Sequence, residues 1–335
     1  MTGTHMLRKE TPVPEPIAAK PNGRRLRRPT LALDALFVPG LIVALMIALT
    51  IASPYFLTSR NLGQVLLQGA VLGIVAVGAT FVIIGGDLDL SIGYNVALSG
   101  IVTALTISHS GNWPLGVLVG LACGVVVGLV NGLLAAVLNV PAFVATLGTG
   151  TVAGGLALYF TNGSTISGLP SGFAALATTN FLGIQTLVWF MLGLFVLAGI
   201  LLHATNFGIR VFASGGNREA AFLAGLAVAR IRLANFVIAG FCGGLAGVLL
   251  TARVQAGQPS VGASLTLYAT AAVILGGCSI LGGTGSMLRA FLGVLLIAVV
   301  QNGLNVLGID YSLQQVAVGG VFVLAACSEV FRRRR

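Results

Sequence analysis

Charged side chains are scarce in this 335-residue sequence. Asp, Glu, Lys and Arg together make up 8% of it, whereas about a quarter of the residues of an ordinary globular domain are charged. Hydrophobic residues make up 56%, and the mean hydropathy is +1.01. This composition excludes a water-soluble domain and indicates a chain that lies in a membrane.

Side chains for catalysis and for nucleotide binding are scarce as well. The three histidines, His5, His109 and His203, lie far apart, and the four cysteines fall inside apolar segments without metal-ligand spacing. No glycine-rich loop ends in Gly-Lys-Ser or Gly-Lys-Thr, the pattern that cradles a nucleotide. We therefore expect no enzyme activity, no metal site and no cofactor bound by this chain.

Long apolar runs are abundant. A helix that spans a membrane needs about 20 mostly apolar residues, and ten segments qualify. They are 31–53, 64–84, 91–108, 115–138, 143–160, 184–204, 233–252, 265–282, 288–308 and 313–330. The predicted fold class is all-α, a polytopic membrane protein of about ten transmembrane helices within residues 31–331. Residues 1–30 form a basic, proline-rich leader that we expect to be disordered, and 332–335 form a basic tail.

Basic residues predict the orientation of these spans. They cluster in the leader, in the loop 205–232 and in the tail, and such clusters are retained in the cytoplasm. An even number of predicted spans separates each cluster from the next, so both termini are predicted to be cytoplasmic. The net charge of +10 is then explained by topology and contact with anionic lipid, and nucleic acid is not an expected partner.

Glycine is frequent, with 47 residues. Small residues let membrane helices pack closely, and helices break only where protein or a water-filled cavity satisfies the freed backbone groups. We predict re-entrant or broken elements at 85–86, 139–143, 257–264 and 276–286. An Asn-Gly-Leu triplet recurs at 131 and 302 in predicted spans of opposite orientation, which fits a 5+5 inverted repeat; chance recurrence explains so short a match equally well.

The run 86-GDLDLSIG-93 resembles the signature of permease subunits of ribose-type monosaccharide ABC importers, the ribose, xylose, arabinose and galactose permeases. The resemblance extends from about residue 40 to the C-terminus. It continues through 131–149, 157–168, 215-GGNREAAFLAGLAVARIRL-233, 251–286 and 298–309. Asp87 departs from the commoner pattern, which has Gly there, and Ala224 stands where Ser is frequent.

The resemblance implies a subunit of an importer in the bacterial inner membrane for a monosaccharide or a similar small polyhydroxylated solute. Its implied partners are cytoplasmic ABC ATPase subunits that use ATP with Mg, a periplasmic or surface solute-binding protein, and a second permease copy, identical or homologous. A secondary transporter of a small polar solute is the alternative. It would need ionisable groups in mid-span, whereas Asp34, His109, His203 and Asp310 lie near predicted span ends.

The resemblance also implies that the loop 205–232 couples the permease to the ATPase. Asn217 suits a helix N-cap, Glu219 suits the first turn, and alanines with Gly225 form a small-residue face on which a groove can close. The alternative is an amphipathic helix on the membrane surface. The implied coupling residues are Gly216, Asn217, Arg218, Glu219, Ala220, Ala221, Ala224 and Gly225.

Asp87 and Asp89 have two open interpretations. Asp89 can cap the helix that follows, and Asp87 is expected to tolerate replacement by Gly if it is incidental. Alternatively, carboxylates in a broken element face the solute path and accept hydrogen bonds from hydroxyl groups. The candidate path residues are Asp87, Asp89, Ser91, Asn95, Asn131, Thr146, Thr149, Asn302 and Asn305, and each of them by itself could be a helix–helix contact. The outer loops 161–181 and 253–264 are either plain connectors or the docking surface of the binding protein.

Overall fold

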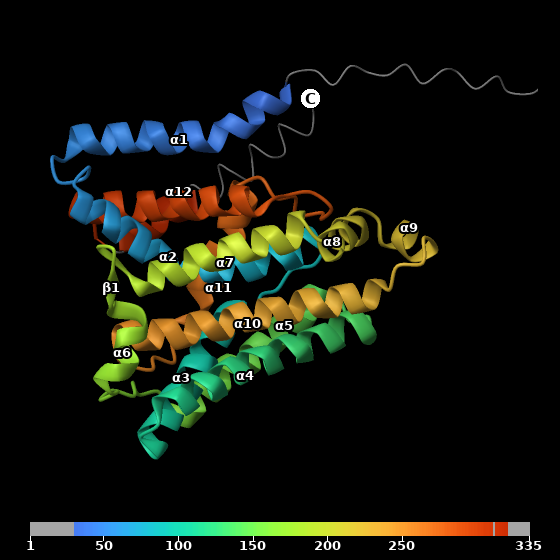
Figure 1. The fold of residues 1–335 in the computed structure, drawn as a ribbon, viewed down its shortest axis with the longest axis horizontal. Coiled ribbons are helices and arrows are strands. Elements are labelled where there is room, and N and C mark those ends of the chain that lie inside the picture. The colour runs from blue at the N-terminus through green and yellow to red at the C-terminus, as the bar shows by residue number, and fades with distance from the viewer. Residues whose placement is uncertain (1–29, 311, 321–335) are drawn as a thin grey trace, which may run out of the picture. The chain divides into compact units, whose positions relative to one another are not determined.

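The computed structural model describes residues 30–310 and 312–320, and these residues are mostly helical (Figure 1). The helices are α1 Thr30–Ala52, α2 Ser59–Ile84, α3 Ile92–Ser110, α4 Trp113–Gly132 with its π-helical end Leu133–Val137, α5 Ala142–Thr161, α6 Ser171–Thr178, α7 Thr186–His203, α8 Asn206–Gly216, α9 Arg218–Leu223, α10 Val228–Val254, α11 Gly262–Leu275 and α12 Met287–Val306. Two short strands, β1 Asn180–Phe181 and β2 Ile184–Gln185, form an antiparallel hairpin. The chain divides into units 1–36 and 37–335, and the features below belong to the second.

Helices α2 and α10 lie at the centre of this unit and pack on each other. Nearly every side chain of α2 from Leu67 to Ile84 is buried, as expected for a helix that is apolar on all sides. Helices α3, α4 and α5 pack together on one flank, and α7, α11 and α12 cover the other side of α2 (Figure 1). The core is therefore built helix on helix.

Close packing of α4 on α10 depends on glycine. Five buried glycines recur at every fourth position of α4: Gly116, Gly120, Gly124, Gly128 and Gly132. A Cβ atom at position 124 would lie 2.5 Å from the backbone of α10. The spacing places all five on one helix face. The close helix packing that the glycine content predicted therefore occurs on this face of α4.

Six helices are long and apolar enough to cross a membrane: α2, α4 with its π-helical end, α5, α7, α10 and α12. They match six of the ten predicted spans. Two shorter apolar helices, 36–52 and α11, match two more. The predicted span 265–282 is wrong at its end, because α11 stops at Leu275 before Gly276 and Gly277, the latter with a φ of 100°. Of the last predicted span, 313–330, only residues 313–320 are described, and they are helical.

Each predicted break contains a non-helical link, but 139–143 and 257–264 were predicted to extend too far, because α5 begins at Ala142 and α11 at Gly262. The links 85–91, 138–141, 255–261 and 276–286 separate α2 from α3, α4 from α5, α10 from α11 and α11 from α12. The predicted outer loop 161–181 contains α6 and the start of the hairpin, neither of which was predicted. Its Ile166 exchanges two backbone hydrogen bonds with Gly257, of 3.0 and 2.8 Å, so the two predicted outer loops are joined. The predicted leader and tail lie outside the described residues.

Candidate functional site

The predicted coupling segment folds as two short helices. Asn217 ends α8 and caps α9, because its side-chain oxygen accepts a hydrogen bond of 2.9 Å from the N–H of Ala220. Glu219 lies in the first turn of α9, as predicted. Gly225, with a φ of 80°, lies in the turn that follows α9, a conformation that favours glycine.

The small-residue face predicted for α9 needs correction. Ala220, Ala224 and Gly225 are exposed, but Ala221 is buried at 5% exposure against its own chain and therefore does not belong to this face. The large apolar side chains Phe222 and Leu223 are instead 70% and 78% exposed. Two adjacent large apolar residues inside a basic loop were the available sequence signal, and the sequence analysis did not use it.

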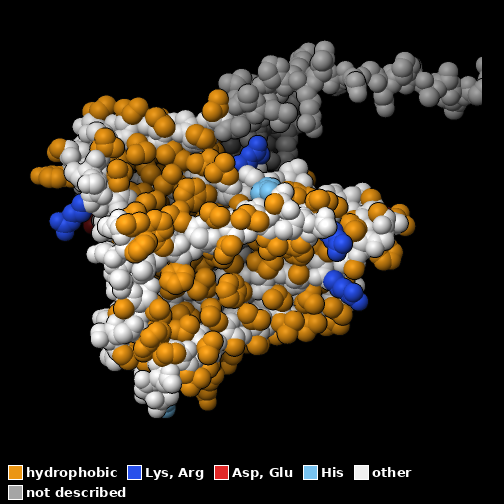
Figure 2. Space-filling view, in the orientation of Figure 1, with side chains coloured by type: hydrophobic (Ala, Val, Ile, Leu, Met, Phe, Trp, Pro, Cys, Tyr) orange, Lys and Arg blue, Asp and Glu red, His pale blue; other side chains and the backbone are white. Residues whose placement is uncertain are grey.

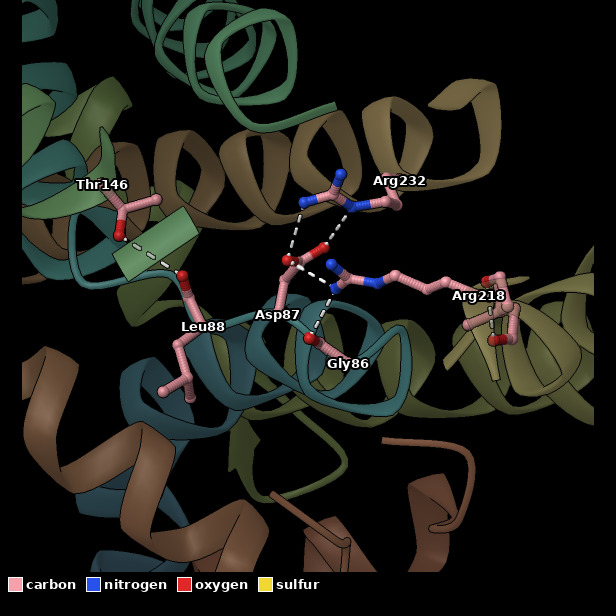
Figure 3. A network of polar contacts seen from close by, with 8 residues as sticks. Gly86, Asp87, Leu88, Thr146, Arg218 and Arg232 are labelled. Carbon is pink, nitrogen blue, oxygen red and sulfur yellow. Dashed lines mark hydrogen bonds and ion pairs between the residues drawn. The ribbon is translucent and has the colours of Figure 1, made fainter. Parts of the chain in front are cut away.

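Asp87 binds two arginines (Figure 3). Arg232 of α10 donates from Nε to Oδ2 at 2.8 Å and from Nη2 to Oδ1 at 2.9 Å. Arg218, the first residue of α9, donates from Nη2 to Oδ1 at 2.7 Å and to the carbonyl of Gly86 at 2.6 Å. Asp87 and Arg232 are buried, with side chains 6% and 8% exposed, whereas that of Arg218 is 42% exposed.

This ion pair changes the interpretation of Asp87. Both carboxylate oxygens are engaged by guanidinium groups, so the carboxylate is not free to bind a solute in this state. The residue is not incidental either, because it balances a buried arginine. Arg232 comes 145 positions later in the chain, and no local pattern identified it as the partner.

Asp89 starts a chain of polar contacts across three elements. Its Oδ1 accepts hydrogen bonds from the N–H of Ser91 at 2.8 Å and from the Ser91 hydroxyl at 2.6 Å. The Ser91 hydroxyl accepts from Nδ2 of Asn131 in α4 at 2.6 Å, and Asn131 Oδ1 accepts from Thr149 in α5. Asp89 therefore orders the turn immediately before α3, because its carboxylate binds Ser91, the N-cap residue of that helix.

Thr146 of α5 holds the backbone of the same link. Its hydroxyl accepts a hydrogen bond of 3.0 Å from the N–H of Leu90. It donates one of 3.3 Å to the carbonyl of Leu88 (Figure 3). Five of the predicted path residues thus meet at one place, on the 85–91 link, α4 and α5. They are Asp89, Ser91, Asn131, Thr146 and Thr149.

Two other predicted path residues hold helices together. Asn95 in α3 donates from Nδ2 to the carbonyls of Gly124 at 3.2 Å and Gly240 at 3.0 Å. Asn302 in α12 exchanges amide hydrogen bonds of 2.9 and 3.1 Å with Asn61 in α2. Both amides are buried and engaged, so the alternative of a helix–helix contact applies to them.

Asn305 lies apart from these groups, at a cavity of about 280 Å³. Side chains of α2, α10, α11, α12 and the helical segment 312–320 line it. They are Gln68, Arg253, Tyr268, Gln301, Asn305, Gln314, Gln315 and Val318. Amide groups both donate and accept hydrogen bonds, so this lining suits a ligand rich in hydroxyl groups. Asn305 was the only one of these residues predicted.

Glycines from three segments meet near the predicted coupling segment. Gly86 ends the turn after α2, Gly215 lies near the end of α8, and Gly282 and Gly283 belong to the link 276–286. The N–H of Gly283 donates to the carbonyl of Ile84 at 2.8 Å. A Cβ atom at position 215 would lie 1.9 Å from that carbonyl oxygen. The three backbones, named here the glycine junction, approach as closely as they do because side chains are absent.

The surface agrees with a membrane environment. Apolar side chains cover most of the flank visible in Figure 2, and the few basic side chains lie near helix ends. No group of three or more His, Cys, Asp or Glu side chains is placed to bind a metal ion within the described part of the chain.

Residues 61–326 match the family described as the permease component of the branched-chain amino acid transport system. Among curated proteins, the ribose import permease protein RbsC of Bacillus subtilis is 41% identical over 86% of this chain and 89% of its own length. The L-arabinose ABC transporter permease protein AraH of Azospirillum brasilense is 37% identical over 88% of this chain and 86% of its own. The RbsC of Escherichia coli K12 is 35% identical over 85% and 91%. No solved structure gave a match.

The helical fold and these matches define a membrane transport protein, and its relatives are permeases and not enzymes. The chain belongs to the family of permease components found by the match, and within it to the ribose-type permease subunits of ABC importers. The resemblance read from 86-GDLDLSIG-93 and the segments after it is confirmed.

Proposed function

We propose that this chain imports a monosaccharide, a pentose such as ribose or arabinose, across the bacterial inner membrane. The observation that carries this proposal is the 41% identity to a ribose import permease along 86% of the chain. We further propose that a solute-binding protein delivers the sugar and that two permease subunits form the path.

The test is transport by the assembled complex. The permease, its cognate ATPase and its binding protein are placed in proteoliposomes, and uptake of labelled ribose and arabinose is measured with ATP inside or absent. We expect uptake of at least one pentose that requires both ATP and the binding protein. Uptake driven by an ion gradient without the ATPase would support the secondary transporter instead.

We propose that the ATPase docks on α9. The exposed side chains of Phe222 and Leu223 support this, because adjacent large apolar side chains on a loop outside the spans favour contact with another protein. Replacing Phe222 by Ser should lower co-purification of the ATPase and ATP-driven uptake together, without loss of inserted permease. Leu182, 77% exposed in the β1–β2 turn, provides the control: Leu182→Ser should leave ATPase binding unchanged.

We propose that the 280 Å³ cavity forms part of the sugar path. Loss of one hydrogen bond to a neutral partner costs about 0.5–1.5 kcal/mol, so Gln301→Leu should weaken sugar uptake about two- to tenfold, mainly in KM. Gln64→Leu is the matched control, since Gln64 is an exposed glutamine of α2 outside the cavity lining. Equal uptake by the two variants would remove the cavity from the path.

We also propose a 5+5 inverted repeat with cytoplasmic termini. The helix pairings support it: α2 packs on α12 as α10 packs on α4, and α3 packs on α10 as α11 packs on α2. At the proposed axis Gly93, near the start of α3, lies against Gly262, the start of α11, and the Gly93 N–H donates to Thr266 at 2.9 Å. Repeats of this kind are common in transporters.

A further inference from the structure

The two arginines on Asp87 hold it in different ways. Arg232 uses two nitrogens on two oxygens, the forked arrangement that is both strong and geometrically fixed, and its side chain is 8% exposed. Arg218 uses one nitrogen, Nη2, for both of its contacts, and its side chain is 42% exposed. Partly exposed ion pairs are weakened by water and salt. The Arg232 contact is therefore the permanent one, and the Arg218 contact can open.

The Arg218 contact joins two regions with different roles. Arg218 is the first residue of α9, the helix proposed to contact the ATPase, and Asp87 lies on the link between α2 and α3. One residue beyond Asp87, the backbone carbonyl of Leu88 binds Thr146, and Asp89 starts the chain through Ser91 and Asn131. A shift at Asp87 is carried into this polar network by the chain itself, because only one residue separates the two aspartates.

The surroundings of the link contain an unsatisfied group. Asn235 of α10 is buried, and its amide oxygen has no hydrogen-bond partner within the described part of the chain. A Cβ atom on Gly85 would lie 2.4 Å from its side-chain nitrogen, so Asn235 lies directly beside the link. A buried oxygen without a partner raises the free energy of the state that contains it.

We propose that Asp87 and Arg218 form a releasable latch that fixes α9 against the 85–91 link in the resting permease. Displacement of α9 by the ATPase opens the Arg218 contact, while Arg232 keeps Asp87 and its charge balanced. The link, freed at one end, then changes the polar network on α4 and α5. Asp87 and Arg218 are positioning residues in this scheme, and the scheme rests on the proposed function.

The latch is tested in the assembled complex, with ATP hydrolysis and sugar uptake measured in parallel. We expect Arg218→Gln to raise hydrolysis in the absence of sugar-loaded binding protein at least threefold, and to lower sugar taken up per ATP at least threefold. Arg218→Lys should restore much of the wild-type ratio, because a single nitrogen makes both contacts of Arg218 and an ammonium group has three donors. Arg230→Gln, at an exposed arginine that forms no ion pair within the described part of the chain, should match wild type.

A double-variant comparison separates the latch from a general effect of lost charge. If the two side chains act as a pair, Asp87→Asn combined with Arg218→Gln should be no worse in uptake per ATP than Asp87→Asn alone. Effects that multiply, or a wild-type ratio for Arg218→Gln, would overturn the latch while leaving the importer assignment intact. A wild-type complex that takes up no sugar would instead overturn the proposed function, and the latch with it.

Discussion

At the scale of single residues, the buried charge of Asp87 has a structural role. The sequence resemblance led us to expect glycine at this position, yet here the carboxylate lies between Arg218 and Arg232. A buried charge is costly without a partner, and breaking such a pair on one side destabilises more than replacing both partners by apolar groups. The acid and the buried arginine must therefore be considered together.

Asp87→Gly should accordingly be poorly tolerated, contrary to the expectation from the family pattern. It leaves the 8% exposed Arg232 side chain without its counter-ion, which costs about 3–5 kcal/mol in comparable buried pairs, and we expect inserted permease to fall severely. Asp87→Gly combined with Arg232→Leu should recover much of that amount. The amount of permease in the membrane is measured by immunoblot for both variants. Normal abundance of Asp87→Gly would contradict the structural role of Asp87.

Asp89 gives a second prediction at this scale. Its Oδ1 accepts two hydrogen bonds from Ser91, and an asparagine carbonyl can accept both, so Asp89→Asn should change the thermal stability of the purified permease little. Asp89→Ala removes both bonds and should cost about 0.5–2 kcal/mol. A large loss of transport by Asp89→Asn at normal abundance would mean that the charge itself acts in the path.

At the scale of elements, backbone contacts between glycines position the segment proposed to contact the ATPase. The glycine junction brings the ends of α2 and α8 and the link 276–286 together without side chains between them. Close approach of this kind is a use of glycine that no larger residue can replace. The mechanical connection of α8 and α9 to the spans is therefore direct, and a single methyl group is enough to disturb it.

Gly215→Ala and Gly216→Ala form a matched pair for this interpretation. The added methyl group at 215 would lie 1.9 Å from the carbonyl oxygen of Ile84, whereas at 216 the nearest atom is 3.8 Å away. Both positions are helical, where alanine is favoured over glycine by about 0.5–1 kcal/mol. We expect Gly215→Ala to lower the thermal stability in detergent and the ATP-driven uptake, and Gly216→Ala to preserve both. Equal behaviour of the two would argue against the junction.

At the scale of the whole molecule, the orientation in the membrane is a prediction that rests on the even number of predicted spans between basic clusters. In a cysteine-free background, Arg230→Cys should resist an impermeant thiol reagent in intact cells, because it precedes most of α10 on the proposed cytoplasmic side. Leu182→Cys, in the turn between β1 and β2, should react. Both side chains are exposed, so access to the reagent is decided by sidedness; the reverse pattern would invert the topology.

The sequence by itself determined the class of this protein and most of its helices. Apolar runs of membrane length, paired glycines at the breaks and the segments shared with ribose-type permeases are local signals, and each can be recognised without knowing what packs against it. Asn217 as the cap of α9 and the break at 85–91 belong to this group. The end of α11 was placed too late because its apolar pattern continues past Gly276 and Gly277, although the backbone does not.

Only the tertiary structure decided which polar side chains act together. Asp87 and Arg232 are separated by 145 positions, and Asn61 and Asn302 by 241, so no spacing rule connects them. Burial of Ala221 and exposure of Phe222 depend on how α9 lies against the rest of the chain. The reason is physical: in a chain this apolar, the cost of leaving a buried polar group unpaired selects its partner through the packing of distant helices, and the sequence around either residue carries no record of that packing.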